Sequence, residues 1–121
     1  MVDKAFLKTF VELETVETQK KRQEGLQGRK KLGEYKGMLF KFDKAERQSI
    51  WMKDTHIPLD IVFLSEQGKV LNIEQGEPES TKKMFSDSEN CKYVLELNKG
   101  KAADFNISLD DNLSFLLPTG L

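Results

Sequence analysis

Two acidic residues lie within apolar runs, where an ionised side chain is costly. Asp60 occurs in the run IPLDIVFL, and Glu96 occurs in the run YVLELN. Because burial penalises the charged form, each carboxyl group needs a partner or a shifted pKa. Two such groups could divide general acid and general base work between them if their pKa values differ. The two residues are therefore candidates for a catalytic pair, and the sequence leaves their separation open.

Asp60 has a structural interpretation as well as a functional one. A cation such as Arg29 or Lys53 could meet its charge. The Thr55 hydroxyl could do so too, together with the backbone amides of the turn at 53–58. We favour this structural role, and a ligand or reaction site is the alternative.

Trp51 is the only tryptophan of the chain, and Lys53 lies two residues away. An indole beside a cation is typical either of a core plug or of a stacking platform for a planar or sugar ligand. We expect Trp51 to lie in the core. The single histidine, His56, and the single cysteine, Cys91, have no neighbours in the sequence that indicate nucleophilic catalysis.

The composition restricts the class of protein. The 121 residues suffice for a single domain, 1–121. Lys and Arg (19) balance Asp and Glu (20), and the net charge of −1 argues against nucleic acid as a partner. One Cys, one His and scattered glycines predict no metal site and no cofactor. Without an apolar run of membrane-spanning length, and with charged residues within 2–9, we expect a soluble, cytoplasmic domain with no membrane partner; an exported or virion-associated protein is the alternative.

Alternation of apolar and polar residues predicts a mainly antiparallel sheet. Strands are expected at 6–14, 37–42, 57–64, 69–74, 92–98 and 113–117, with a further apolar run at 49–53. The segment 57–64 is apolar on both faces, which is typical of a strand inside a sheet. A short helix at 18–27 would begin at Thr18 and end at Gly25 or Gly28, and 101–105 suits one helical turn. The expected fold class is α+β: a compact, barrel-like sheet, mainly antiparallel, with one or two short helices.

Residues 75–90 break the periodicity of the neighbouring strands. This stretch contains Gly76, Pro78 and three serines, and Met84 and Phe85 are its candidate anchors. We expect a long surface loop whose residues 76–90 are the most mobile part of the domain.

Four segments carry a resemblance to a known family: EGLQGR at 24–29, GMLFKF at 37–42, SIWMKDTHIPLDIVFLSEQGKV at 49–70 and KYVLELNKGKA at 92–102. In this order and spacing they resemble the domain of unknown function 192 family, from about residue 18 to residue 115. The resemblance implies a compact, mainly antiparallel β domain with small helical elements and no established activity. The polar signature of the family falls on residues that we take as candidate binding residues: Arg29, Trp51, Lys53, Thr55, Asp60 and Glu96.

Three functions are open on this basis. The favoured one is a non-enzymatic binding or assembly module that presents Trp51, Lys53 and the 75–90 loop to a carbohydrate, peptide or protein partner. The first alternative is a carboxylate-dependent, hydrolase-like enzyme that uses Asp60 and Glu96. The second alternative is a structural component of a viral or cellular particle. The oligomeric state is left open.

Overall fold

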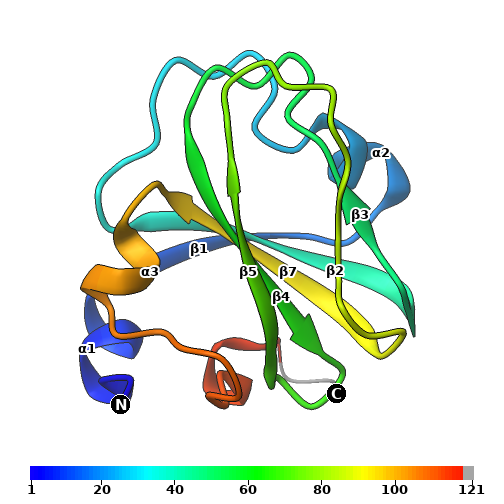
Figure 1. Ribbon diagram of the computed structural model, residues 1–121. Helices are drawn as coiled ribbons and strands as arrows, with labels where there is room; N and C mark the ends of the chain where they lie inside the picture. Colours follow the sequence, from blue (N-terminus) through cyan, green and yellow to red (C-terminus); the bar gives the residue numbers. More distant parts are fainter. Residues whose placement is uncertain (119–121) are drawn as a thin grey trace.

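The computed structural model describes residues 1–118, and its main feature is one five-stranded sheet. The strands lie in the order β1 (Glu12–Val16), β2 (Lys36–Glu46), β7 (Cys91–Asn98), β4 (Leu59–Ser65) and β5 (Val70–Gly76). Neighbouring strands are antiparallel except β1 and β2, which are parallel. Among the described residues β1 and β5 form the two edges of an open sheet (Figure 1). The α+β class with a mostly antiparallel sheet is therefore confirmed, whereas closure into a barrel is not.

Smaller elements flank this sheet. Two short strands, β3 (Ser49–Ile50) and β6 (Met84–Phe85), pair with each other. The helical elements are α1 (Lys4–Phe10), α2 (Gln19–Glu24), α3 (Lys101–Asp104) and the 3-10 turn η1 (Ser114–Leu116). Figure 1 shows α1 and α3 on one side of the sheet and α2 with β3 on the other. Among residues 1–118, no helix combines the length and the apolar character needed to cross a membrane.

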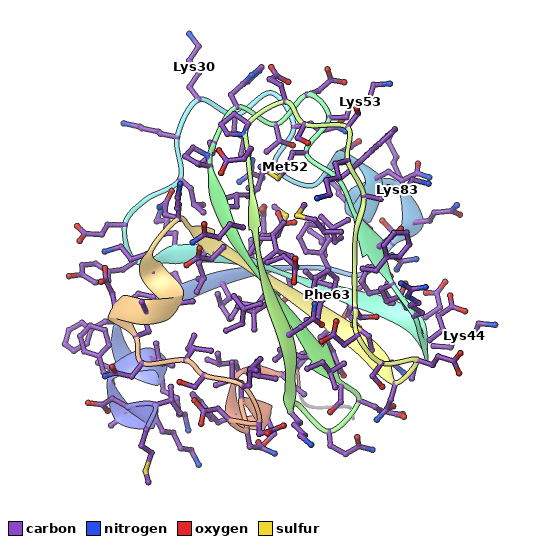
Figure 2. The ribbon with its side chains drawn as sticks, in the orientation of Figure 1. Lys30, Lys44, Met52, Lys53, Phe63 and Lys83 are labelled. Carbon is purple, nitrogen blue, oxygen red and sulfur yellow. The ribbon has the colours of Figure 1, made fainter. Side chains whose placement is uncertain are left out.

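The sheet is buried on both faces, by two separate apolar clusters. On the face toward α1 and α3, the cluster includes Leu7, Leu39, Val62, Leu64, Leu95, Leu97, Ala102 and Phe105. On the face toward α2, it includes Leu26, Phe40, Met52, Leu59, Ile61, Phe63 and Val94. Figure 2 shows Met52 and Phe63 inside the molecule. All seven residues of β4 are buried, which confirms the prediction that 57–64 lies inside the sheet, although β7 is its middle strand.

Helix α2 begins after the predicted cap Thr18 and ends at Gly25, the earlier of the two ends that the sequence allows. The Thr18 hydroxyl oxygen accepts a hydrogen bond from the Lys21 backbone N–H at 3.1 Å, which caps the amino end. Gly25 ends the helix at φ 46° and ψ −127°, a conformation that a side chain strongly disfavours. A Cβ atom at this position would also lie 3.3 Å from the ring of Phe40 on β2. Glycine therefore sets how closely the end of α2 approaches the sheet.

The amino-terminal segment is a helix where the sequence predicts a strand. The expectation for 6–14 is wrong in its first half, because α1 occupies these residues and β1 follows. Asp3 caps α1, its Oδ1 accepting from the Phe6 backbone N–H at 3.0 Å. Phe6 and Phe10 are one helical turn apart, and their ring centroids lie 5.0 Å from each other. The apolar spacing that looked strand-like is thus a helical one.

The last expected strand, at 113–117, is also wrong. The Asn112 side-chain oxygen accepts from the Ser114 backbone N–H at 2.8 Å, and the Leu117 N–H donates to the Ser114 carbonyl at 3.1 Å. These local bonds turn the chain into η1. Leu113 is fully buried all the same, so the apolar pattern marks burial here and not an extended strand.

The segment at 75–90 is more structured than a continuous loop. Strand β5 continues to Gly76, and Met84 and Phe85 form β6 against β3. Met84 and Phe85 thus anchor the segment as expected. The mobility of 76–90 stays a prediction.

Candidate functional site

A pocket of about 300 Å³ lies between α2 and the sheet. Strands β2 and β7 contribute its floor through Phe40 and Glu96, and α2 and β3 contribute its walls. Its lining consists of Gln19, Arg22, Gln23, Glu24, Gly25, Leu26, Gln27, Phe40, Phe42, Ser49, Ile50, Trp51, Met52, Thr55 and Glu96. The volume is at the lower end of the range for small-ligand sites, about 300–1,000 Å³.

Glu96 is the unusual residue of this pocket. It is 4% exposed, and its neighbours in register are Met38 on β2 and Ile61 on β4. Within the described part of the chain, no side chain pairs with its carboxyl group and no donor bonds to it. Every fully enclosed side-chain oxygen in residues 1–118 has a hydrogen-bond partner, so the unpartnered Glu96 oxygens must open to the pocket. Burial raises the pKa of Glu96 to about 8, and the group is mainly protonated at neutral pH.

Arg22 lies on the same lining without neutralising Glu96. Its guanidinium donates to the backbone carbonyls of Glu17 and, at 3.0 Å, Lys41. It also pairs with the Asp43 carboxylate at 3.4 Å. The Arg22 cation therefore ties α2 to β2, and its side chain is one part of the pocket wall.

Trp51 lies at the mouth of the pocket and not in the core. Its side chain is 43% exposed, and the ammonium group of Lys53 lies 5.4 Å from its ring centroid. The expectation of a core position is wrong because the chain turns the next residue, Met52, inward to 1% exposure. The alternative that the sequence left open, an indole face available to a ligand, matches this position.

Thr55 also belongs to the pocket, whereas Arg29 does not. Thr55 is buried on the lining, and its hydroxyl donates to the Lys53 carbonyl at 3.3 Å. Arg29 forms an ion pair with Glu14 at 2.8 Å away from the pocket lining. Of the six candidate residues, the structure brings Trp51, Thr55 and Glu96 together, with Lys53 beside the indole.

Asp60 lies on the other face of the sheet and has a different set of partners from those expected. Its Oδ2 accepts from the backbone N–H groups of Gly100 at 3.0 Å and Ala102 at 2.9 Å. The expectation of a cation, the Thr55 hydroxyl or amides of the 53–58 turn is therefore wrong. Because Asp60 meets the orphan amides at the start of α3, its charge fastens this helix to β4.

The two buried carboxyl groups do not open into one pocket. In the pairing of β4 with β7, Asp60 is opposite Leu97, and Ile61 is opposite Glu96. A shift of one residue along paired strands changes the face, so the sheet itself separates the two groups. Within residues 1–118, no group of three or more His, Cys, Asp or Glu side chains gathers as a metal site would require.

His56 and Cys91 take no part in the pocket. His56 Nδ1 lies 2.8 Å from an oxygen of Glu79, and both side chains are about half exposed. Cys91 is fully buried, and burial raises the pKa of its thiol to about 11, which keeps it protonated.

Sequence reasoning missed the contribution of α2. Gln19, Gln23 and Gln27 all line the pocket, although the segment looks like a solvated helix. The spacing of Gln19 and Gln23 was the available signal, because residues i and i+4 share a helix face. Gln27 lies beyond Gly25, where α2 has ended. Whether this face of α2 meets water or a pocket depends on where β3 packs, and the sequence around α2 does not specify that tertiary contact.

Comparisons with known proteins agree with this fold. The model of the DUF192 family (Uncharacterized ACR) matches residues 2–115. A crystal structure of a protein of unknown function from Novosphingobium aromaticivorans DSM 12444 is 32% identical, with a TM-score of 0.78, over 83% of this chain and 71% of that chain. The crystal structure of a "putative transcription regulator" from Sinorhizobium meliloti 1021 is 33% identical, also with a TM-score of 0.78, over 83% and 78% of the two chains. No protein with a curated description matches the sequence.

Proposed function

The chain belongs to the DUF192 family, and we propose that it is a non-enzymatic binding module whose pocket above Glu96 takes a small carbohydrate. The family brings no activity with it, so the proposal depends on the site. One observation carries it: the Glu96 carboxyl group is buried, has no partner among residues 1–118 and opens to a pocket. A ligand group is the natural partner for such a carboxyl.

The polar groups of the pocket suit hydroxyl groups. A protonated carboxyl group both donates and accepts hydrogen bonds, and so do the side-chain amides of Gln19, Gln23 and Gln27. Sugar hydroxyls need both kinds of partner. Arg22 is already bonded to β2, which leaves the inner lining without a free cation for an anionic group. The inner pocket thus favours a neutral, hydroxyl-rich part of a ligand.

The apolar groups suit the faces of a sugar ring. Phe40 and Phe42 line the inner pocket, and the half-exposed indole of Trp51 lies at its mouth. Aromatic side chains that combine an apolar surface with a polar rim are frequent in sites for such amphipathic ligands. An extended peptide or a protein surface would gain less from a pocket of about 300 Å³.

Hydrolysis is the alternative function, for a specific reason. A carboxyl group with a raised pKa is also what a general acid needs, and Glu24 is the other carboxylate on the lining. Binding is favoured over hydrolysis because Asp60, the carboxylate expected to act with Glu96, lies on the opposite face of the sheet. DNA binding is not part of the proposal, since the net charge of −1 offers no general attraction for phosphates.

Isothermal titration with a panel of mono- and disaccharides tests the proposal. We expect Glu96→Leu to lower the affinity about tenfold or more, because it removes the hydrogen bonds at the pocket floor. Glu96→Gln keeps a donor and an acceptor and should retain most of the affinity. Glu14→Gln, which changes an exposed carboxylate outside the pocket, is the matched control.

Two results would contradict this function. If no saccharide of the panel binds, or if Glu96→Leu binds as the parent does, the pocket is not a carbohydrate site. Release of reducing sugar from a disaccharide, abolished by Glu96→Gln, would replace binding by hydrolysis. The variants should fold, since leucine and glutamine, like the protonated Glu96, place no charge at this buried position.

A further inference from the structure

A second hollow adjoins the pocket on its outer side. It measures about 610 Å³ and is lined by Lys20, Gln23, Glu24, Gln27, Ser49, Trp51 and Lys83. Gln23, Glu24, Gln27, Ser49 and Trp51 border both spaces, so the outer hollow continues the inner pocket. A ligand can therefore occupy both, with its inner part over Glu96.

The outer hollow carries an excess of positive charge. Lys20 comes from α2, Lys83 comes from the residue before β6, and the ammonium of Lys53 lies over the Trp51 ring. None of these three lysines forms an ion pair within residues 1–118. Glu24 is the one carboxylate on this part of the lining. Figure 2 shows Lys83 beside β3, on the side of the molecule where α2 lies.

The charged groups around the inner pocket and the outer hollow indicate how a bound ligand would be oriented. An anionic group placed deep in the pocket would lie near Glu96 and would lose its water without gaining a cation. The same group in the outer hollow would remain partly hydrated and would lie between unpaired ammonium groups. A neutral sugar would leave these ammonium groups unused.

We propose that the ligand is an acidic sugar, whose hydroxyl groups lie over Glu96 and whose anionic group lies in the outer hollow between Lys20 and Lys83. The inference rests on the proposed carbohydrate site and names the class of sugar. A carboxylate, as in a uronate, and a phosphate, as in a sugar phosphate, share the chemistry required.

Matched sugar series test this inference at pH 7. Each series contains a neutral sugar, its uronate and its 6-phosphate: glucose, glucuronate and glucose 6-phosphate, and the corresponding galactose and mannose compounds. We expect at least one acidic sugar to bind more tightly than its neutral parent. The difference should shrink as salt is raised, because exposed charges are screened. The acidic sugar that binds more tightly shows whether the site prefers a carboxylate or a phosphate.

The lysine variants locate the anionic group. Replacing both Lys20 and Lys83 by Gln should weaken the acidic sugar about three- to tenfold and leave the neutral parent unchanged, since exposed charge pairs contribute modestly. Replacing both Lys4 and Lys8 by Gln removes the same two charges from α1, on the opposite side of the sheet (Figure 1), and should change neither affinity.

The outcomes separate this inference from the proposed function. If the neutral sugars bind as tightly as the acidic ones, the site takes carbohydrate but does not recognise charge, and the inference fails alone. If acidic sugars bind but the double lysine variant binds them equally well, the placement in the outer hollow is overturned. If no member of the three series binds, the inference fails, and the panel of mono- and disaccharides decides whether the proposed carbohydrate site fails with it.

Discussion

Asp60 and Glu96 lie on adjacent strands, one register position apart, and are buried on opposite faces of the sheet. Asp60 accepts two backbone hydrogen bonds, from Gly100 and Ala102. Glu96 has no side-chain partner within residues 1–118 and opens to a pocket. A single shift of register thus gives two similar residues different surroundings. The Asp60 carboxyl group is tied to the fold, and the Glu96 carboxyl group is the one that we propose binds the ligand.

The bonds of Asp60 predict a loss of stability when it is truncated. Asp60→Ala leaves the amides of Gly100 and Ala102 without their acceptor, at a cost of about 1–3 kcal/mol for each buried group. Asp60→Asn keeps one acceptor oxygen and should cost less. Urea unfolding measures both, with the exposed Asp87→Ala as a control. Equal stability of Asp60→Ala and the parent would contradict the structural role.

Glu96 predicts a dependence of stability on pH. Burial raises its pKa from 4.5 to about 8, so between these values the folded protein holds a proton that the unfolded chain has released. The free energy of unfolding therefore falls as pH rises from about 4.5 to about 8, by up to about 1.4 kcal/mol per pH unit. The stabilisation from the protonated Glu96 is fully present below pH 4.5 and is lost above about pH 8.

Comparison with Glu96→Gln isolates this effect. The other charged groups on the pocket lining, Arg22 and Glu24, are the same in both proteins, so their contributions largely cancel. Urea unfolding from pH 5 to pH 9 measures the free energy of unfolding of both proteins. The value for Glu96→Gln minus that for the parent should rise up to about pH 8 and then stay constant. A difference that does not change with pH would mean that Glu96 has an ordinary pKa.

The sequence predicts the sheet better than its ends. Residues 57–64 are recognisable because apolar side chains on both faces belong to a strand inside a sheet. Residues 92–98 are recognisable from the alternation of Tyr93, Leu95 and Leu97, and the two segments form β4 and β7. At the chain ends, an apolar residue marks burial without specifying the backbone. Leu113 is buried just before η1, and Phe6 packs from α1, since local side-chain caps decide the turn or helix there.

The sequence identifies Glu96 as unusual, but it does not identify the pocket around it. Glu96 stands out because a carboxyl group between leucines is costly wherever it lies. The side of the sheet that it faces depends on the register with β4, which the sequence does not specify. The glutamines on the pocket lining carry no such energetic signal, and only the spacing of Gln19 and Gln23 marks a shared helix face. A polar helix face looks the same whether it meets water or a pocket.

Gly25 predicts a specific backbone effect beside the pocket. Gly25→Ala adds a Cβ in a conformation at φ 46° and places it 3.3 Å from Phe40, so we expect a loss of about 1–3 kcal/mol of unfolding free energy. Gly28 also has a positive φ, 75°, but a Cβ there meets no atom within 4 Å. Gly28→Ala is therefore the control that separates strain from crowding. Equal losses in the two variants would show that the contact with Phe40 does not matter.

The segment between β5 and β6 predicts a gradient of amide exchange. Near β6, the Ser86 N–H donates to the Gln48 carbonyl at 2.9 Å, and the Asp87 N–H donates to the Asn72 side chain at 2.9 Å. Residues 77–83 depend on isolated contacts, such as the Glu79 N–H with the Thr55 carbonyl at 2.9 Å. We therefore expect amides within 77–83 to exchange much faster than those of Ser86 and Asp87.

Hydrogen exchange followed by NMR resolves these amides one by one. The amides of β4, which is buried on both faces, provide the slow reference within the same sample. Because Lys83 lies in the fast segment and on the outer hollow, a bound acidic sugar should slow exchange in 77–83 and leave β4 unchanged. Uniformly slow exchange from 76 to 90 in the free protein would show that the segment is already rigid, and that its order owes nothing to a ligand.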